Sequence, residues 1–302
     1  MQSLRVLLSG LVDYAGIFPP VQLPMRGAVQ HYAGYRQGKW DWVLGRFTVP
    51  VGRLEEFEGA LQDLADESWR VGPWRLSALA GRSLEIDLRK VLEFNRRHGE
   101  SAARPSRFES IEVKVLSVED VQRAADLVSD AFELYVEVPV ATDPDVWIAA
   151  AADAGVRVKA RTGGVSPDLF PTVPDLARFL VECGRAKVPF KATAGLHHPV
   201  RALRPLTTEL KGPSAVMHGF LNVFLAAAFV SCCGMAFDDA VGILGEEAPA
   251  RFVVTEDAIA WGSFRVDVEA LRAVRRTFAT AFGSCSFEEP IEDLQAIGLL
   301  ES

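Results

Sequence analysis

The sequence is poor in cysteine and has no excess of positive charge. Its 302 residues include four cysteines, which have neither CxxC spacing nor the density of a disulfide-stapled domain: Cys183, Cys232, Cys233 and Cys285. We expect free thiols in a reducing compartment, and therefore a cytoplasmic protein. A formal net charge of −8 gives no electrostatic footprint for nucleic acid or for an anionic membrane surface. Neither class of partner is expected.

Long apolar runs and targeting segments are also missing. The most apolar stretch, 220–229, is too short to span a bilayer. Residues 1–11 contain one arginine and no apolar run before a small-residue cleavage site, so no signal peptide is expected. No low-complexity segment or linker divides the chain, whose length suffices for one large core. The sequence predicts a single domain over residues 1–302.

Strand-like and helix-like runs alternate along almost the whole chain. The predicted strands are 12–18, 42–50, 74–81, 110–115, 134–139, 156–164, 188–198 and 282–287. In the fourth to seventh strands, apolar residues alternate with ionisable ones, so one face is apolar and the other charged. In a parallel barrel the apolar face meets the helices and the other face lines the interior. The predicted fold is a single (β/α)8 TIM barrel, with a long loop (199–217) after the seventh strand and a small hairpin insertion (251–265) before the last helix (268–278) and the eighth strand.

The inward faces of the fourth to seventh strands carry a group of ionisable residues. They are Glu112, Lys114, Glu137, Lys159, Arg161 and Lys191. Two negative and four positive charges leave a local surplus of +2 in a chain whose net charge is −8. A cationic barrel mouth favours a small anionic substrate, a carboxylate or a phosphate. A structural ion-pair network across the barrel is the alternative, but the unequal numbers argue against it.

Clustered lysines predict nucleophilic chemistry on a carbonyl carbon. Like charges in a partly desolvated site depress the pKa of at least one lysine, and a neutral lysine forms a Schiff base. A nearby carboxylate, Glu112 or Glu137, would then move protons. We expect Lys159 and Lys191 to be catalytic in this scheme. The candidates for substrate binding on or after these strands are Lys114, Arg161, Thr193, His197 and His198.

Two short motifs resemble the second half of deoxyribose-phosphate aldolase and its class I aldolase relatives. The runs 159–163 (Lys-Ala-Arg-Thr-Gly) and 191–195 (Lys-Ala-Thr-Ala-Gly) are similar to that family's Lys-Thr-Ser-Thr-Gly and Lys-Ala-Ser-Gly-Gly, within a likeness that covers residues 133–198. The resemblance implies a lyase without a cofactor, in which Lys159 forms the Schiff base, Lys191 lowers its pKa and Glu112 shuttles the proton. Arg161 stands where the family has a small residue, and His197-His198 replaces its phosphate-binding loop.

The histidines predict a second mechanism. Asp13, one of His197 and His198, and Asn222 are similar to the divalent-metal site of the hydroxymethylglutaryl-lyase and isopropylmalate-synthase superfamily. Such N and O donors suit a divalent metal ion. That family spaces its histidines as His-x-His, whereas adjacent histidines diverge, so only one of this pair would ligate easily. The alternative function is a metal-dependent carbon–carbon lyase.

Other segments support weaker hypotheses. The run 283–286 (Gly-Ser-Cys-Ser) is a small-residue loop in which Ser284 and Ser286 would hold an anion. Cys285 is a candidate nucleophile that has no assigned histidine partner. Outside enzymes, the protein would be a non-catalytic barrel that binds a small anion, or a homo-oligomer whose interface is the apolar helix 220–229.

Overall fold

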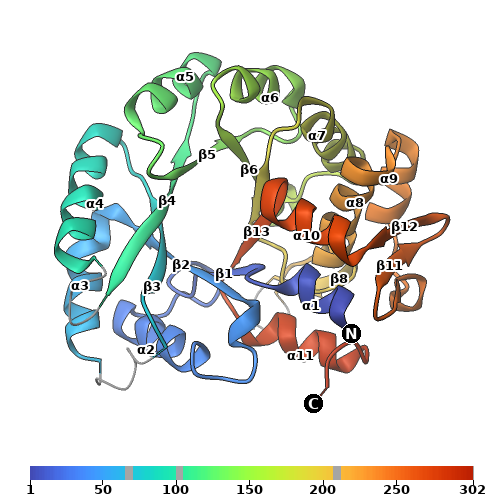
Figure 1. Cartoon of the computed structure of the whole chain (residues 1–302), viewed down its shortest axis with the longest axis horizontal. Helices are drawn as coiled ribbons and strands as arrows, with labels where there is room; N and C mark the ends of the chain where they lie inside the picture. The colour runs from blue at the N-terminus through green and yellow to red at the C-terminus, as the bar shows by residue number, and fades with distance from the viewer. Residues whose placement is uncertain (65–70, 100–104, 207–211, 302) are drawn as a thin grey trace.

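The computed structural model describes residues 1–64, 71–99, 105–206 and 212–301, and its centre is a closed barrel of parallel strands (Figure 1). The barrel order is β1-β13-β7-β6-β5-β4-β3-β2. The strands are β1 (Val12–Tyr14), β2 (Leu44–Pro50), β3 (Trp74–Leu79), β4 (Ser106–Lys114), β5 (Glu133–Val138), β6 (Arg157–Arg161), β7 (Phe190–Thr193) and β13 (Ala279–Ser284). Neighbouring strands pair in parallel throughout. The predicted TIM barrel is confirmed.

Helices surround the barrel (Figure 1). Each barrel strand is followed by one of α2 (Met25–Tyr35), α3 (Leu54–Gln62), α4 (Leu84–His98), α5 (Val118–Leu127), α6 (Pro144–Asp153), α7 (Val173–Ala186), α8 (Phe220–Cys233) and α11 (Glu288–Ala296). Three further helices are α1 (Gln2–Leu8), α9 (Phe237–Leu244) and α10 (Val268–Thr277). Helix α11 was not predicted, so 268–278 is not the last helix of the chain.

The apolar faces of the strands meet the helices, as the alternation predicts. On β7, Phe190 lies between Phe179 of α7, with ring centroids 5.8 Å apart, and Phe224 of α8, at 6.0 Å. Helix α7 begins where the Thr172 hydroxyl accepts a hydrogen bond from the Asp175 backbone N–H at 3.2 Å, a normal N-cap. Packing on this face leaves the next residue of β7, Lys191, pointing to the interior.

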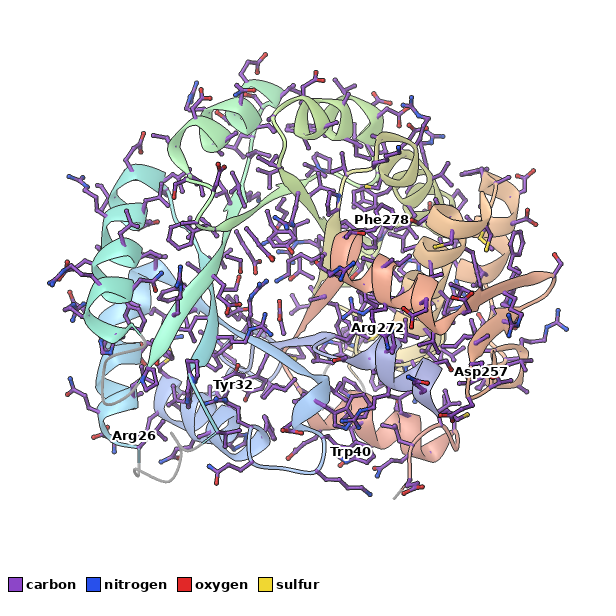
Figure 2. All side chains as sticks on the ribbon, in the orientation of Figure 1. Arg26, Tyr32, Trp40, Asp257, Arg272 and Phe278 are labelled. Atoms are coloured by element: carbon purple, nitrogen blue, oxygen red, sulfur yellow. The ribbon has the colours of Figure 1, made fainter. Side chains whose placement is uncertain are left out.

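The barrel interior is filled by polar side chains (Figure 2). Near the N-terminal ends of the strands, Arg46 contacts Glu109 and Glu133 at 3.0 Å each. Above them, the Tyr135 hydroxyl lies 3.0 Å from Thr280 Oγ1. Bulky aliphatic side chains usually fill such barrels. Here charge pairing replaces them, and the ionisable face predicted from the strands extends to both ends of the barrel.

Both insertions contain more regular structure than was predicted. The 199–217 segment is not only a loop: β8 (Ala202–Pro205) and β9 (Ser214–Met217) form an antiparallel pair, and residues 207–211 lie outside the described residues. The predicted hairpin is a three-stranded sheet of β10 (Val253–Val254), β11 (Ala258–Trp261) and β12 (Phe264–Asp267). Short strands of two to four residues give too little alternation to be recognised from sequence.

Two further expectations need correction. The eighth strand is 279–284 rather than 282–287, because the small residues that begin it carry little strand signal. The 220–229 run of α8 is buried within the chain, with Phe220 stacked on Phe282 of β13 at 5.3 Å, so it is not a free oligomer interface. Within the described residues, no helix has the length and apolar character needed to cross a membrane.

Candidate active site

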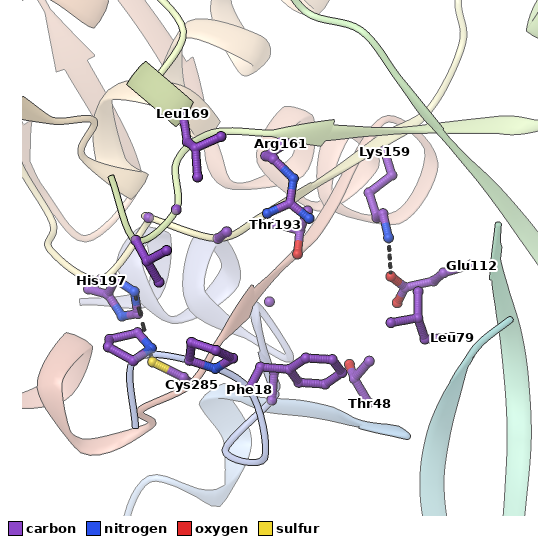
Figure 3. A pocket seen from close by; sticks show the side chains of 18 of the residues that line it. Phe18, Thr48, Leu79, Glu112, Lys159, Arg161, Leu169, Thr193, His197 and Cys285 are labelled. Carbon is purple, nitrogen blue, oxygen red and sulfur yellow. Dashed lines mark hydrogen bonds and ion pairs between the residues drawn. The ribbon is translucent and has the colours of Figure 1, made fainter. Parts of the chain in front are cut away.

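A cavity of about 320 Å³ opens at the C-terminal end of the barrel strands (Figure 3). Its lining combines the charged interior residues with loops that follow β1, β6, β7 and β13. The lining residues used below are Glu112, Lys159, Arg161, Lys191, Thr193, His197, Gly283 and Cys285. This end of the strands is where TIM-barrel enzymes hold their active sites. The cavity is therefore the candidate active site.

Three strands bring Glu112, Lys159 and Lys191 together in the interior. Lys159 on β6 and Lys191 on β7 are paired in register, and each side chain is 3% exposed or less. Glu112 on β4 reaches both: its Oε2 lies 3.0 Å from Lys159 Nζ and its Oε1 lies 2.7 Å from Lys191 Nζ. The Ser77 hydroxyl on β3 also donates to Oε1, at 2.6 Å. The convergence expected from alternation is present for these three residues.

Two more carboxylates extend this group into a chain. Asp13 on β1 lies 2.6 Å from Lys191 Nζ, and Glu137 on β5 lies 2.9 Å from Lys159 Nζ. Arg161 Nε lies 3.4 Å from Glu137. The resulting order is Asp13, Lys191, Glu112, Lys159, Glu137 and Arg161, and we call these six residues the charge chain. Three carboxylates face three cations, so the expected surplus of +2 is absent from this group.

Pairing decides the ionisation of the charge chain. Burial alone would raise the pKa of Glu112, but Lys191 and Lys159 outweigh it and hold that pKa well below its usual range. Glu137 follows the same pattern, with burial opposed by Lys159 and Arg161, and its pKa is also lowered. Burial would lower the pKa of Lys191, but Asp13 and Glu112 raise it instead. The expectation was that like charges depress the pKa of at least one lysine, and Lys191 is not that lysine, because its two carboxylates favour the ammonium form.

The predicted substrate-binding residues on the strands divide into two groups. Arg161 and Thr193 both line the cavity, and the Arg161 side chain is 47% exposed. Lys114 is exposed and is not among the lining residues. It is the last residue of β4, at the rim of the barrel, so alternation alone did not place it in the cavity. Lys114 is not part of the gathered group.

On the other side of the cavity, His197 and Cys285 lie together (Figure 3). Cys285 Sγ is 4.0 Å from His197 Nε2, and His197 Nδ1 is 3.3 Å from Glu289 Oε2. Burial would lower the pKa of His197, but Cys285 and Glu289 raise it to about 10. Glu289, in the first turn of α11, was not predicted as a site residue. Its only sequence signal is its position four residues after Cys285, at the start of a helix.

The serines of the 283–286 loop hold local structure instead of facing the cavity. Ser284 Oγ lies 3.2 Å from His197 Nδ1, and the Ser286 hydroxyl accepts from the Glu289 backbone N–H at 3.1 Å. Neither serine is among the cavity-lining residues. This placement does not support the prediction that Ser284 and Ser286 bind an anion. The Ser284 hydroxyl contacts His197, and the Ser286 hydroxyl contacts the first turn of α11.

The residues of the predicted metal site are not gathered. Asp13 contacts Lys191, whereas His198 Nδ1 lies 2.6 Å from Asp293 and outside the cavity lining. The Asn222 amide donates to the Ile243 and Glu246 carbonyls at 2.7 and 2.8 Å, which ties α8 to the end of α9. Among residues 1–64, 71–99, 105–206 and 212–301, no three His, Cys, Asp or Glu side chains are grouped to hold a metal ion. Asp13 and Asn222 have separate structural partners, and His197 and His198 both contact Glu289.

Comparison of the chain with protein-family models, with curated proteins and with solved structures gave no match. The barrel and the contacts within its cavity therefore supply the argument about function.

Proposed function

We propose that the protein is a lyase of the class I aldolase type, which acts on a small anionic carbonyl compound through a Schiff base on Lys159. The observation that carries the proposal is Glu112, which contacts Lys159 and Lys191 at the floor of a cavity at the catalytic end of the barrel. A carboxylate within hydrogen-bond distance of a lysine can transfer protons to and from an imine on that lysine. The likeness of 133–198 to the deoxyribose-phosphate aldolase family supports the same roles.

The distribution of counterions favours Lys159 as the nucleophile. Lys191 is held by Asp13 and Glu112, and its pKa is raised. Lys159 also contacts two carboxylates, but each is shared: Glu112 with Lys191, and Glu137 with Arg161. Removing the proton from Lys159 leaves both carboxylates with another cation. Removing it from Lys191 leaves buried Asp13 without its contact at 2.6 Å, so that only Arg46 and Arg275, which lie beyond ion-pair distance, still offset its charge. Lys159 is therefore the lysine that loses its proton at lower energetic cost.

The charge chain supplies the proton transfers of this reaction. Glu137 or Glu112 takes a proton from Lys159, and the neutral amine attacks the carbonyl carbon of the substrate. The same carboxyl returns the proton to the hydroxyl of the carbinolamine, which leaves as water, and the iminium forms. This iminium withdraws electrons while the carboxylate takes the proton of the hydroxyl on the β carbon, so the bond between the α and β carbons breaks to give an enamine and an aldehyde. Arg161, half exposed above Lys159, would bind the anionic group of the substrate.

Borohydride trapping tests the proposal. The protein is mixed with a set of keto acids and sugar phosphates, reduced with borohydride and measured by intact mass. We expect a covalent adduct that maps to Lys159, that is lost in Lys159→Met and that persists in the control Lys90→Met on the exposed face of α4. An adduct that persists in Lys159→Met and is lost in Lys191→Met would overturn the assignment. Binding of these ligands by calorimetry with neither adduct nor turnover would instead indicate the non-catalytic anion-binding barrel.

A further inference from the structure

The cavity contains a second reactive group that the lysine mechanism does not use. Cys285 and His197 line the cavity, are 6% and 8% exposed, and lie opposite Lys159 and Glu112 (Figure 3). Cys285 comes from the loop after β13, and His197 from the loop after β7. These strands are neighbours in the barrel, so the two side chains meet at the cavity wall.

The contacts of His197 orient it toward the thiol. Its Nδ1 lies 3.3 Å from Glu289 Oε2 and 3.2 Å from Ser284 Oγ, and the carboxylate favours a proton on Nδ1; its Nε2 is 4.0 Å from Cys285 Sγ. A nucleophile, a base and a carboxylate that orients the base form the arrangement by which enzymes activate a weak nucleophile. The other ionisable neighbours are His198, with its ring centroid 6.4 Å from that of His197, and Tyr14, whose pKa burial and nearby Cys285 raise.

A comparison with the other cysteines argues against simple packing. Cys183, on α7, is fully buried, and burial raises its pKa well above the usual value. Cys232 and Cys233, at the end of α8, are exposed. Among the described residues, Cys285 is the cysteine that combines a histidine at 4.0 Å with a place in the cavity wall. Reactive cysteines lie beside a cationic partner and within reach of a ligand.

We propose that Cys285, His197 and Glu289 form a thiolate site that holds a small aldehyde in the cavity as a hemithioacetal. In this step the Cys285 thiolate attacks the aldehyde carbon and a carbon–sulfur bond forms. The carbonyl π electrons move to oxygen, which takes the proton from His197 Nε2. The products are a neutral hemithioacetal and a neutral imidazole, and the reverse reaction releases the aldehyde. Glu289 is a positioning residue, because it orients His197 and does not face the aldehyde.

The choice of an aldehyde rests on the proposed function, whereas the thiolate site does not. Cleavage of a carbon–carbon bond through a lysine imine produces an aldehyde fragment within the cavity of about 320 Å³ that both groups share. A thiol on the wall opposite Lys159 is placed to capture this fragment. In the direction of synthesis, the same thiol would hold the aldehyde before the enamine attacks it.

Alkylation by iodoacetamide, measured by peptide mass spectrometry, tests the thiolate site. At neutral pH we expect Cys285 to react at least about tenfold faster than exposed Cys232 and Cys233, although it is nearly buried. His197→Gln should remove this advantage, and the control His98→Gln, at the end of α4 and outside the cavity lining, should keep it. Glu289→Gln should shift the pH profile of Cys285 alkylation upward. A Cys285 rate no higher than that of the exposed cysteines, in protein that circular dichroism shows to be folded, would overturn the site.

Protection from alkylation tests the ligand. Glyoxylate and acetaldehyde should each slow the alkylation of Cys285 reversibly, in wild type and in Lys159→Met alike. Loss of protection in Lys159→Met would show that the aldehyde is held by the lysine, and would overturn the hemithioacetal. Borohydride trapping at Lys159 should persist in Cys285→Ser. The two proposals can therefore fail separately, because one readout follows the thiol and the other the amine.

Discussion

Lys159 and Lys191 occupy paired positions on neighbouring strands, and one carboxylate, Glu112, contacts both ammonium groups. The two lysines nevertheless have different surroundings. Lys191 reaches toward β1 and Asp13, whereas Lys159 reaches toward β5 and Glu137. Substitutions in the charge chain should therefore have unequal effects on stability and on chemistry.

The pair of Asp13 and Lys191 should dominate the stability of the charge chain. Either Asp13→Asn or Lys191→Met removes one partner of a fully buried pair, and we expect each to lower the free energy of unfolding by about 3 kcal/mol. The double substitution should lower the free energy of unfolding by clearly less than the sum of the two single losses, because neither Asp13 nor Lys191 is then left as an unpaired charge. Urea unfolding of the four proteins measures the coupling. Additive losses would contradict the pairing.

Acid should destabilise the protein through the same carboxylates. In the folded protein the pKa values of Glu112 and Glu137 are lowered, because nearby cations outweigh the effect of burial. Below the ordinary glutamate pKa of about 4.3, the unfolded chain therefore binds more protons than the folded protein does. The free energy of unfolding should therefore rise with pH in this window and fall on acidification. Urea unfolding from about pH 7 to about pH 3 measures the slope.

Glu112→Gln should make this acid dependence shallower, since one of the responsible groups is gone. Glu55→Gln, at an exposed position on α3, is the matched control and should leave the slope unchanged. Equal slopes in wild type and Glu112→Gln would show that Glu112 is not held ionised by the two lysines.

A glycine fixes the position of Asp13. A Cβ at Gly45 would overlap Asp13 Oδ1, the atom that accepts the Arg46 backbone N–H at 2.7 Å. We expect Gly45→Ala to destabilise the protein by about 1–3 kcal/mol through overpacking and to displace Asp13 from Lys191. Gly59→Ala, on α3 where a Cβ meets nothing within 4 Å, should instead stabilise by about 0.5–1 kcal/mol. Thermal unfolding compares the two.

The guanidinium of Arg161 should set the affinity for anions. Arg161→Ala removes one charge-assisted contact, so we expect it to weaken the binding of small carboxylates at least about tenfold. Calorimetry measures this change in affinity. Its effect on stability should stay within about 1 kcal/mol, because the side chain is half exposed. Unchanged affinity would remove Arg161 from the substrate site. Arg185→Ala, on the exposed face of α7, is the control.

Strand alternation was sufficient to predict the barrel and its central charged residues. Glu112, Lys159 and Lys191 each lie in a run whose neighbours are clearly apolar, so the face that they occupy follows from the period of two. Alternation gave no information about partners on strands with weak patterns. Asp13 lies on a three-residue strand, and its contact with Lys191 joins residues 178 positions apart. The charge balance was therefore wrong for two reasons: Asp13 was not counted with the group, and Lys114, which lies outside it, was.

The Cys285–His197 pair could not be predicted for a different reason. The pairing of β13 with β7 shifts register between Ala279 and Phe282. As a result, Thr280 faces the interior and Phe282 packs on α8, but the next residue, Gly283, lines the cavity. A bulge of this kind changes which residues face inward and cannot be recognised from alternation. The partner histidine comes from a loop after another strand, where no periodic signal exists.

The neutrality of the charge chain affects the binding of an anionic ligand in the cavity. Three carboxylates already balance three cations, so a carboxylate or phosphate ligand brings an uncompensated negative charge into a region of low permittivity. Uptake of a proton from the solvent along with the anion would restore the balance. Binding then becomes a joint equilibrium of ligand and hydrogen ion, and its measured enthalpy depends on the heat of ionisation of the buffer.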